Sequence, residues 1–245
     1  MEKNHDLIMS AESSLVIFIS DKITRGDPLV DINAFTELSK GEKILSKKNC
    51  ICVFKSSIHH DQDYLPKPSA GEKIIKLRSK FYIDLDIILK SNNEYMDKFN
   101  ILESFDNPTE KLSAKFDEKF SSLRIIPNIP LVPSPAYPFP QRVIPIFGKI
   151  KDSFLAKDTY FKISCEKLNF KTVAQTSGEF VICIDDEVVN TATILNTDKT
   201  KFQFEVQVEK ISFEDAKMQI TKFNDLTVEI PISKSYNLGI ITEAI

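Results

Sequence analysis

The sequence predicts a mainly β protein, a β-rich α+β fold in three parts. An N-terminal mixed α+β domain (residues 1–124) and a C-terminal antiparallel β-sandwich (148–245) are joined by an extended proline-rich arm (125–147). Short runs rich in β-branched residues recur along the chain, and the second half keeps an alternating apolar–polar pattern. Seven of the twelve prolines fall between Pro127 and Pro145.

Strands in the N-terminal region are predicted from three segments. The short apolar runs at residues 14–20 and 49–56 are typical of buried strands. Residues 72–90 are the longest candidate, and apolar and acidic side chains alternate strictly within them from residue 83 to residue 87. That alternation predicts a strand with one buried face and one solvated face.

Helices are expected only in this N-terminal region. In residues 92–105 the apolar side chains recur at helical spacing, which predicts a short helix. A period of four between Leu112, Phe116 and Phe120 predicts a second helix that ends near residue 121. Residues 29–45 allow a third.

The arm is the most unusual segment of the chain. Residues 125–141 carry no charge, and proline at this density predicts polyproline II geometry and excludes helix and central strand. Because an apolar arm exposed to water would be a large adhesive patch, we expect it to lie against a surface. That surface is either the chain's own domains or a partner subunit. The residues predicted to make the contact are Ile126, Ile129, Leu131, Val132, Tyr137, Phe139 and Ile144.

The C-terminal part predicts strands throughout. From residue 201 to residue 210, apolar and polar side chains alternate, which is typical of a half-buried strand. Turn-like residues separate strand candidates at intervals of about 8–12 residues, as in an antiparallel sandwich. The candidates are residues 159–165, 180–184, 188–195, 201–210, 217–223 and 226–232.

Composition excludes several classes of function. Six widely spaced glycines leave no phosphate-binding loop, and the last 185 residues contain no histidine for acid–base chemistry. A net charge of -3, with neither half basic, argues against nucleic acid as a partner. We expect no cofactor. No secretory signal or membrane span is expected, since no apolar run reaches about 18 residues.

The four cysteines form no C-x-x-C pair. Cys50 and Cys52 alternate in an apolar run, so on a strand they lie on one face, where they are expected to be reduced packing residues. A reducing compartment follows from this, and we expect a soluble cytoplasmic protein or one incorporated into an assembled particle.

Two clusters are weak candidates for metal binding. His59, His60, Asp61 and Asp63 offer four potential ligands within one polar loop. Asp84 and Asp86 present two carboxylates on one strand face, a geometry that can hold a divalent cation. The run Asp-Leu-Asp-Ile, thirteen residues after Gly71, resembles the second half of the nucleotidyltransferase signature. The resemblance implies metal-dependent nucleotidyl transfer, although Glu72 stands where that family has a small residue that grips phosphate.

The sequence as a whole favours a non-catalytic role, with no catalytic residue and no metal site. We expect a structural subunit of a larger assembly, such as a virion, a phage tail or a contractile injection machine, whose partners are protein subunits of the same or another chain. One alternative is a nucleotidyltransferase-like enzyme that uses Asp84 and Asp86. The other is a β-sandwich adaptor that binds peptides or ligands at open sheet edges.

Overall fold

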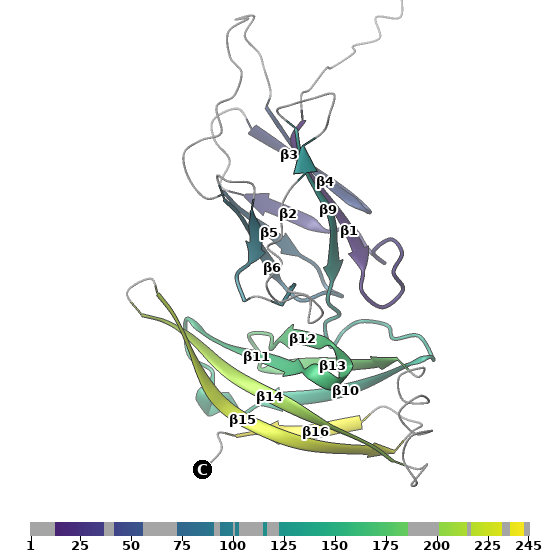
Figure 1. Ribbon diagram of the computed structural model, residues 1–245, viewed down its shortest axis with the longest axis vertical. Helices are drawn as coiled ribbons and strands as arrows, with labels where there is room; N and C mark the ends of the chain where they lie inside the picture. Colours follow the sequence, from purple (N-terminus) through teal and green to yellow (C-terminus); the bar gives the residue numbers. More distant parts are fainter. Residues whose placement is uncertain are drawn as a thin grey trace, which may run out of the picture.

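The computed structural model describes residues 13–36, 42–55, 73–90, 94–99, 101–102, 115–116, 123–185, 201–214, 217–231 and 236–242. These residues form strands and two short 3-10 helices, and no α-helix occurs among them. The prediction of a mainly β protein is therefore confirmed. Within the same residues, no helix has the length and apolar character needed to cross a membrane. Figure 1 shows the strands in two lobes, one above the other.

The first lobe contains a five-stranded sheet and a four-stranded sheet. The five-stranded sheet has the order β3-β4-β1-β9-β8, in which β1 runs parallel to β9 and antiparallel to β4. The four-stranded sheet has the order β2-β5-β6-β7. The strands are β1 (Ser13–Asp21), β2 (Asn33–Thr36), β3 (Glu42–Lys47), β4 (Cys50–Lys55), β5 (Lys73–Arg78), β6 (Leu85–Leu89), β7 (Tyr95–Asp97), β8 (Lys115–Phe116) and β9 (Arg124–Leu131).

The second lobe contains a three-stranded sheet, β13-β10-β16, and a four-stranded sheet, β12-β11-β14-β15. Here too the first strand, β10, runs parallel to the last, β16. The elements are β10 (Val143–Ile150), η1 (Asp152–Phe154), β11 (Thr159–Cys165), η2 (Glu166–Leu168), β12 (Phe170–Val173), β13 (Glu179–Asp185), β14 (Lys201–Glu214), β15 (Lys217–Pro231) and β16 (Tyr236–Ile241).

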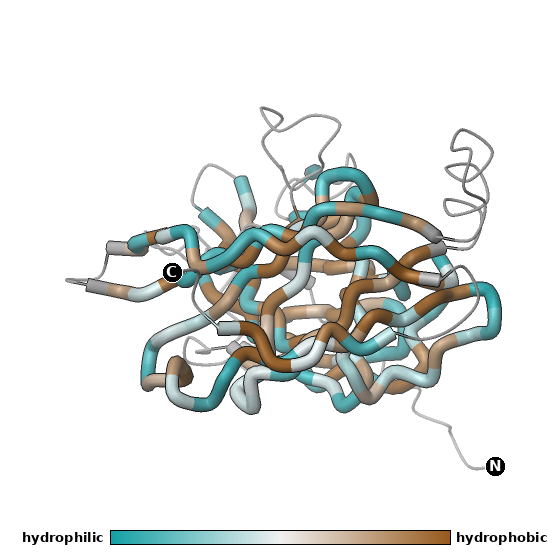
Figure 2. Tube along the Cα trace, turned by 90° about the horizontal axis from the view of Figure 1, so that it is seen from below, coloured by the Kyte–Doolittle hydropathy of each residue, from teal (hydrophilic) through white to brown (hydrophobic). Residues whose placement is uncertain are grey.

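Alternating side chains explain most of these strands. In β14 the apolar positions Phe202, Phe204, Val206 and Val208 are all buried, and the residues between them are exposed. The predicted alternation from residue 83 to residue 87 is also present, since its apolar side chains are buried. Figure 2, which views the molecule from the side of the second lobe, shows hydrophobic and hydrophilic residues alternating along the tube.

The helices expected in the N-terminal region are wrong wherever the structure describes those residues. Strands β2, β7 and β8 lie in the three segments for which helices were predicted or allowed. In the second of these segments, β7 is followed by a turn in which the carboxylate of Asp97 accepts hydrogen bonds from the backbone N–H groups of Phe99, Ile101 and Leu102. This turn brings apolar side chains inward at a spacing that a helix would also give. Residues 37–41, 92–93, 100, 103–105, 112–114 and 117–121 of these segments lie outside the described part.

The proline-rich arm also differs from its prediction. Its first part is β9, a strand between β1 and β8, and its last part belongs to β10. Proline is tolerated in β9 because β8 pairs only with Arg124 and Ile125. Pro127 and Pro130 lie beyond these paired residues, where β9 needs no N–H group to bond to β8. The pairing with β1 also shifts register at this point. Only residues 132–142 connect the lobes outside named strands.

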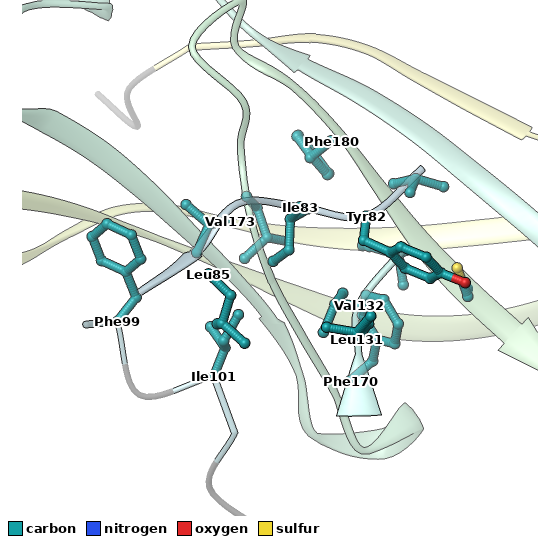
Figure 3. Close-up of a cluster of buried hydrophobic side chains, with 14 of the residues drawn as sticks. Tyr82, Ile83, Leu85, Phe99, Ile101, Leu131, Val132, Phe170, Val173 and Phe180 are labelled. Atoms are coloured by element: carbon teal, nitrogen blue, oxygen red, sulfur yellow. The ribbon is translucent and has the colours of Figure 1, made fainter. Parts of the chain in front are cut away.

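The two lobes share one hydrophobic core. All buried apolar side chains of the described residues belong to one cluster that runs through both lobes. Figure 3 shows its central part, where Tyr82 and Ile83 of the first lobe and Val132 of the connection lie with Phe170 and Phe180 of the second lobe. A shared core of this kind makes the two lobes one rigid body, because separating them would expose large apolar side chains.

Candidate functional site

The outer side of the five-stranded sheet carries apolar side chains where a solvated face is expected. Inward-pointing residues of β1 and β4, such as Ile17 and Ile51, are fully buried. Yet Phe18 is 42% exposed and Leu45 is 47% exposed on the opposite side. We call this side the outer apolar face; its apolar members are Val16, Phe18, Leu45, Cys50, Cys52, Phe54 and Ile125.

Strand register makes these residues neighbours. One row across the sheet runs from Leu45 of β3 through Cys52 and Val16 to Ile125 of β9. The next row places Phe18 opposite Cys50. Directly opposed residues on adjacent strands have Cβ atoms about 4.5–5.5 Å apart, so the two rows form a continuous patch.

The charges around this patch have one sign. Lys43 and Lys47 lie on the outer side of β3, and Lys115 lies on the outer side of β8; all three are exposed. Among the residues that the structure describes, no acidic side chain occupies the outer side of this sheet. The outer apolar face thus has an apolar centre and basic edges, a combination that suits an apolar surface with acidic margins.

Asp84 and Asp86 line a second feature, a cleft of about 790 Å³ between the lobes. Arg78 of β5 pairs with both acids, at 2.6 Å from Asp86 and 3.4 Å from Asp84. The cleft removes part of the water around Asp84 and so raises its pKa, while Arg78 lowers it and Asp86 raises it further. Because a guanidinium already pairs with the two carboxylates, an additional cation would have to compete with Arg78 for them.

Lys98 lies on the wall of the same cleft and contacts aromatic rings of both lobes. Its ammonium lies 5.2 Å from the ring centre of Phe99 in its own lobe. It also lies 4.4 Å from the ring centre of Tyr160 and 4.9 Å from that of Phe213, both in the second lobe. It donates a hydrogen bond of 3.3 Å to the Tyr160 hydroxyl. Each of the two cation–π contacts with the second lobe stabilises the contact between the lobes by about 0.5–1 kcal/mol.

A buried carboxylate forms the polar centre of the junction. Asp21 is fully buried, and its Oδ2 accepts hydrogen bonds from the hydroxyls of Tyr82 at 2.6 Å and Tyr137 at 2.7 Å. Its Oδ1 accepts two more from the backbone N–H groups of Ile23 and Thr24. These bonds join the end of β1, the segment before β6 and the connection between the lobes at one point.

Next to this centre, Lys22 reaches into the second lobe. Its ammonium lies 4.6 Å from the ring centre of Phe170. Burial lowers the pKa of Lys22 to about 8, although the nearby Cys183 thiol raises it. Lys22 therefore contacts the second lobe, and its burial disfavours the protonated form of its amino group.

The residues predicted for the interaction arm lie within the chain's own core. Ile126 and Ile129 are fully buried, and Tyr137 is 4% exposed. Leu131, Val132 and Ile144 are also buried, and Phe139 packs against the same core. The sequence left two surfaces open for the arm, the chain's own domains or a partner subunit. These side chains lie against the chain's own domains.

The second metal candidate, at His59, His60, Asp61 and Asp63, lies outside the described residues. In the described part, no group of three or more His, Cys, Asp or Glu side chains is placed to hold a metal ion.

Sequence reasoning missed the outer apolar face, although its signal was present. The runs at 14–20 and 49–56 are apolar at consecutive positions, so both faces of each strand are apolar.

Comparison with known proteins adds no functional assignment. No protein-family model matches the chain. No curated protein matches it either.

Proposed function

We propose that the chain is a non-catalytic structural subunit of a larger protein assembly, and that the outer apolar face is the surface through which it is held. The observation that carries this proposal is the exposure of Phe18 and Leu45 on a sheet face whose described charges are all basic. Contiguous exposed apolar surface with a polar rim is characteristic of protein interaction sites.

The rigidity of the two-lobed body supports the same role. The shared core, the Asp21 hydrogen bonds and the Lys98 contacts all hold the lobes in one arrangement. A subunit with a fixed shape loses little conformational freedom when it is incorporated, so more of its contact energy remains as affinity. The predicted interaction arm contributes to this rigidity, since its side chains fill the junction.

The proposal is tested by recovering the tagged chain from cells that make it naturally and measuring its mass by size exclusion with light scattering. We expect the wild-type chain in a stoichiometric complex, and Phe18→Asp and Leu45→Asp chains as folded monomers. Ile74→Asp is the matched control, because Ile74 is also 42% exposed but lies in the other sheet of the first lobe. A wild-type chain recovered only as a monomer would contradict the proposal.

The adaptor alternative has its own supporting observation at the opposite end of the molecule. The long strand β15 lies at the edge of its sheet, and a shallow groove of about 300 Å³ separates it from β16. Leu226, Leu238 and Ile240 line this groove, and Ile240 is 67% exposed. Recovery of many substoichiometric peptides that Ile240→Asp abolishes would favour the adaptor over the structural subunit.

A further inference from the structure

Two free thiols stand side by side on the outer apolar face. Cys50 and Cys52 are two residues apart on β4, so their Cα atoms are about 6.6 Å apart and their side chains leave the same face of the sheet. Both side chains are half-buried. Partial burial raises the pKa of Cys52, and the neighbouring Cys50 thiol raises it further.

The four positions that flank the thiols give them a mostly apolar setting with one positive charge. On β1, Phe18 is opposite Cys50 and Val16 is opposite Cys52. On β3, Lys47 is opposite Cys50 and Leu45 is opposite Cys52. Three apolar neighbours limit the access of water, and the single ammonium group can balance negative charge on the sulfur atoms.

A disulfide between these two residues is disfavoured by their geometry. Their Cα separation of about 6.6 Å is at the upper end of the range for disulfides, and side chains that leave one strand face run parallel instead of pointing at each other. The pair therefore persists as a dithiol. Two thiolates form a ligand set for a soft metal ion.

The number of ligands selects the ion. Zinc sites are tetrahedral and usually take three or four protein ligands. Here the described residues supply only two, since they contain no cluster of three or more His, Cys, Asp or Glu ligands. Cu(I) is soft, prefers thiolates and is satisfied by two of them in a linear arrangement.

We propose that Cys50 and Cys52 bind one Cu(I) ion as a two-thiolate site on the outer apolar face. Two S–H bonds break, two Cu–S bonds form, two protons pass to the solvent, and copper keeps its oxidation state. The sulfur atoms separate to about 4.6 Å, twice a metal–sulfur distance of about 2.3 Å, which side-chain rotation allows. The complex carries one net negative charge, which Lys47 balances. The site does not depend on the proposed assembly role.

The experiment is a competition for Cu(I) between the reduced chain and the coloured chelator bathocuproine disulfonate, without oxygen. We expect the wild-type chain to withdraw one Cu(I) ion, and Cys50→Ser and Cys52→Ser chains to withdraw none. Lys47→Met should weaken binding about 10-fold, as loss of an outer partner of a metal site typically does. Circular dichroism of each variant verifies that the sheet is intact.

The double variant Cys50→Ser/Cys52→Ser keeps Cys165 and Cys183 and so reports any copper bound by the other thiols. Equal withdrawal of copper by this variant and the wild type would overturn the proposal, as would failure of the wild-type chain to withdraw any. Phenylarsine oxide, which bridges two neighbouring thiols, gives a second readout. The wild-type chain should keep one arsenical through a wash with a monothiol, and loss of it would show that the two sulfur atoms cannot share one centre.

Discussion

Replacement of Tyr137 by phenylalanine tests how the lobes are joined. The change removes only the hydroxyl that donates a 2.7 Å hydrogen bond to Oδ2 of the buried Asp21. Hydrogen bonds to charged groups contribute about 1.5–3 kcal/mol, so we expect the free energy of unfolding to fall by about 2 kcal/mol. For a chain of this length, that loss corresponds to a decrease in Tm of about 4–8 °C.

The assay is urea unfolding followed by circular dichroism, because the chain has no tryptophan. A shared core predicts one cooperative transition for both lobes. Tyr236→Phe is the control, since the hydroxyl of this half-buried tyrosine has no hydrogen bond among the described residues. We expect the control to stay within about 0.5 kcal/mol of the wild type.

A double variant makes the test stricter. Tyr82→Phe also removes a donor to Asp21, together with the acceptor of a hydrogen bond from the backbone N–H of Leu29. In Tyr82→Phe/Tyr137→Phe, Oδ2 of Asp21 loses both of its described donors. The loss should therefore exceed the sum of the two single losses. A loss below about 0.5 kcal/mol for Tyr137→Phe, or separate transitions for the two lobes, would refute the reasoning.

Three further predictions concern other parts of the molecule. Gly148→Ala should destabilise the chain by about 1–3 kcal/mol in urea unfolding, because the added Cβ would overlap the Phe180 ring; a neutral effect would contradict this packing. Burial lowers the pKa of Lys22 to about 8 from 10.5, so its charged form is disfavoured in the folded chain. The stability of the wild type relative to Lys22→Met should therefore rise between about pH 8 and pH 10.5, and a flat difference would show that the lysine is solvated. Mg²⁺ with nucleoside triphosphates should leave Tm unchanged, because Arg78 already pairs with the two carboxylates of the cleft; a rise of several degrees would favour the enzyme alternative.

The sequence predicts the strands well where side chains alternate or form short apolar runs. β1, β4, β6 and β14 overlap predicted segments because burial of one face imposes a period of two on the sequence. The same reasoning fails in the N-terminal region around β7. There the turn made by Asp97 imitates a helical spacing, and only the hydrogen bonds of its carboxylate reveal the difference.

The candidate site was harder to predict than the fold. The sequence shows that the arm is apolar and uncharged, but the surface that it contacts depends on strand order, which local patterns do not contain. For the same reason the outer apolar face was missed, since it requires β1, β3, β4 and β9 to be neighbours. The pairing of Asp84 and Asp86 with Arg78 likewise depends on β5 lying beside β6.

The parallel pairing of the first strand with the last in each lobe has a consequence for synthesis on the ribosome. β1 cannot pair with β9 until residue 131 has left the exit tunnel. The Asp21 carboxylate gains its hydrogen bond from Tyr137 later still, when residue 137 has emerged. The second lobe in turn needs β16, almost at the end of the sequence given, beside β10. Nascent chains therefore expose unsatisfied strand edges for most of their elongation, and chaperone occupancy should decline only as each closing strand emerges.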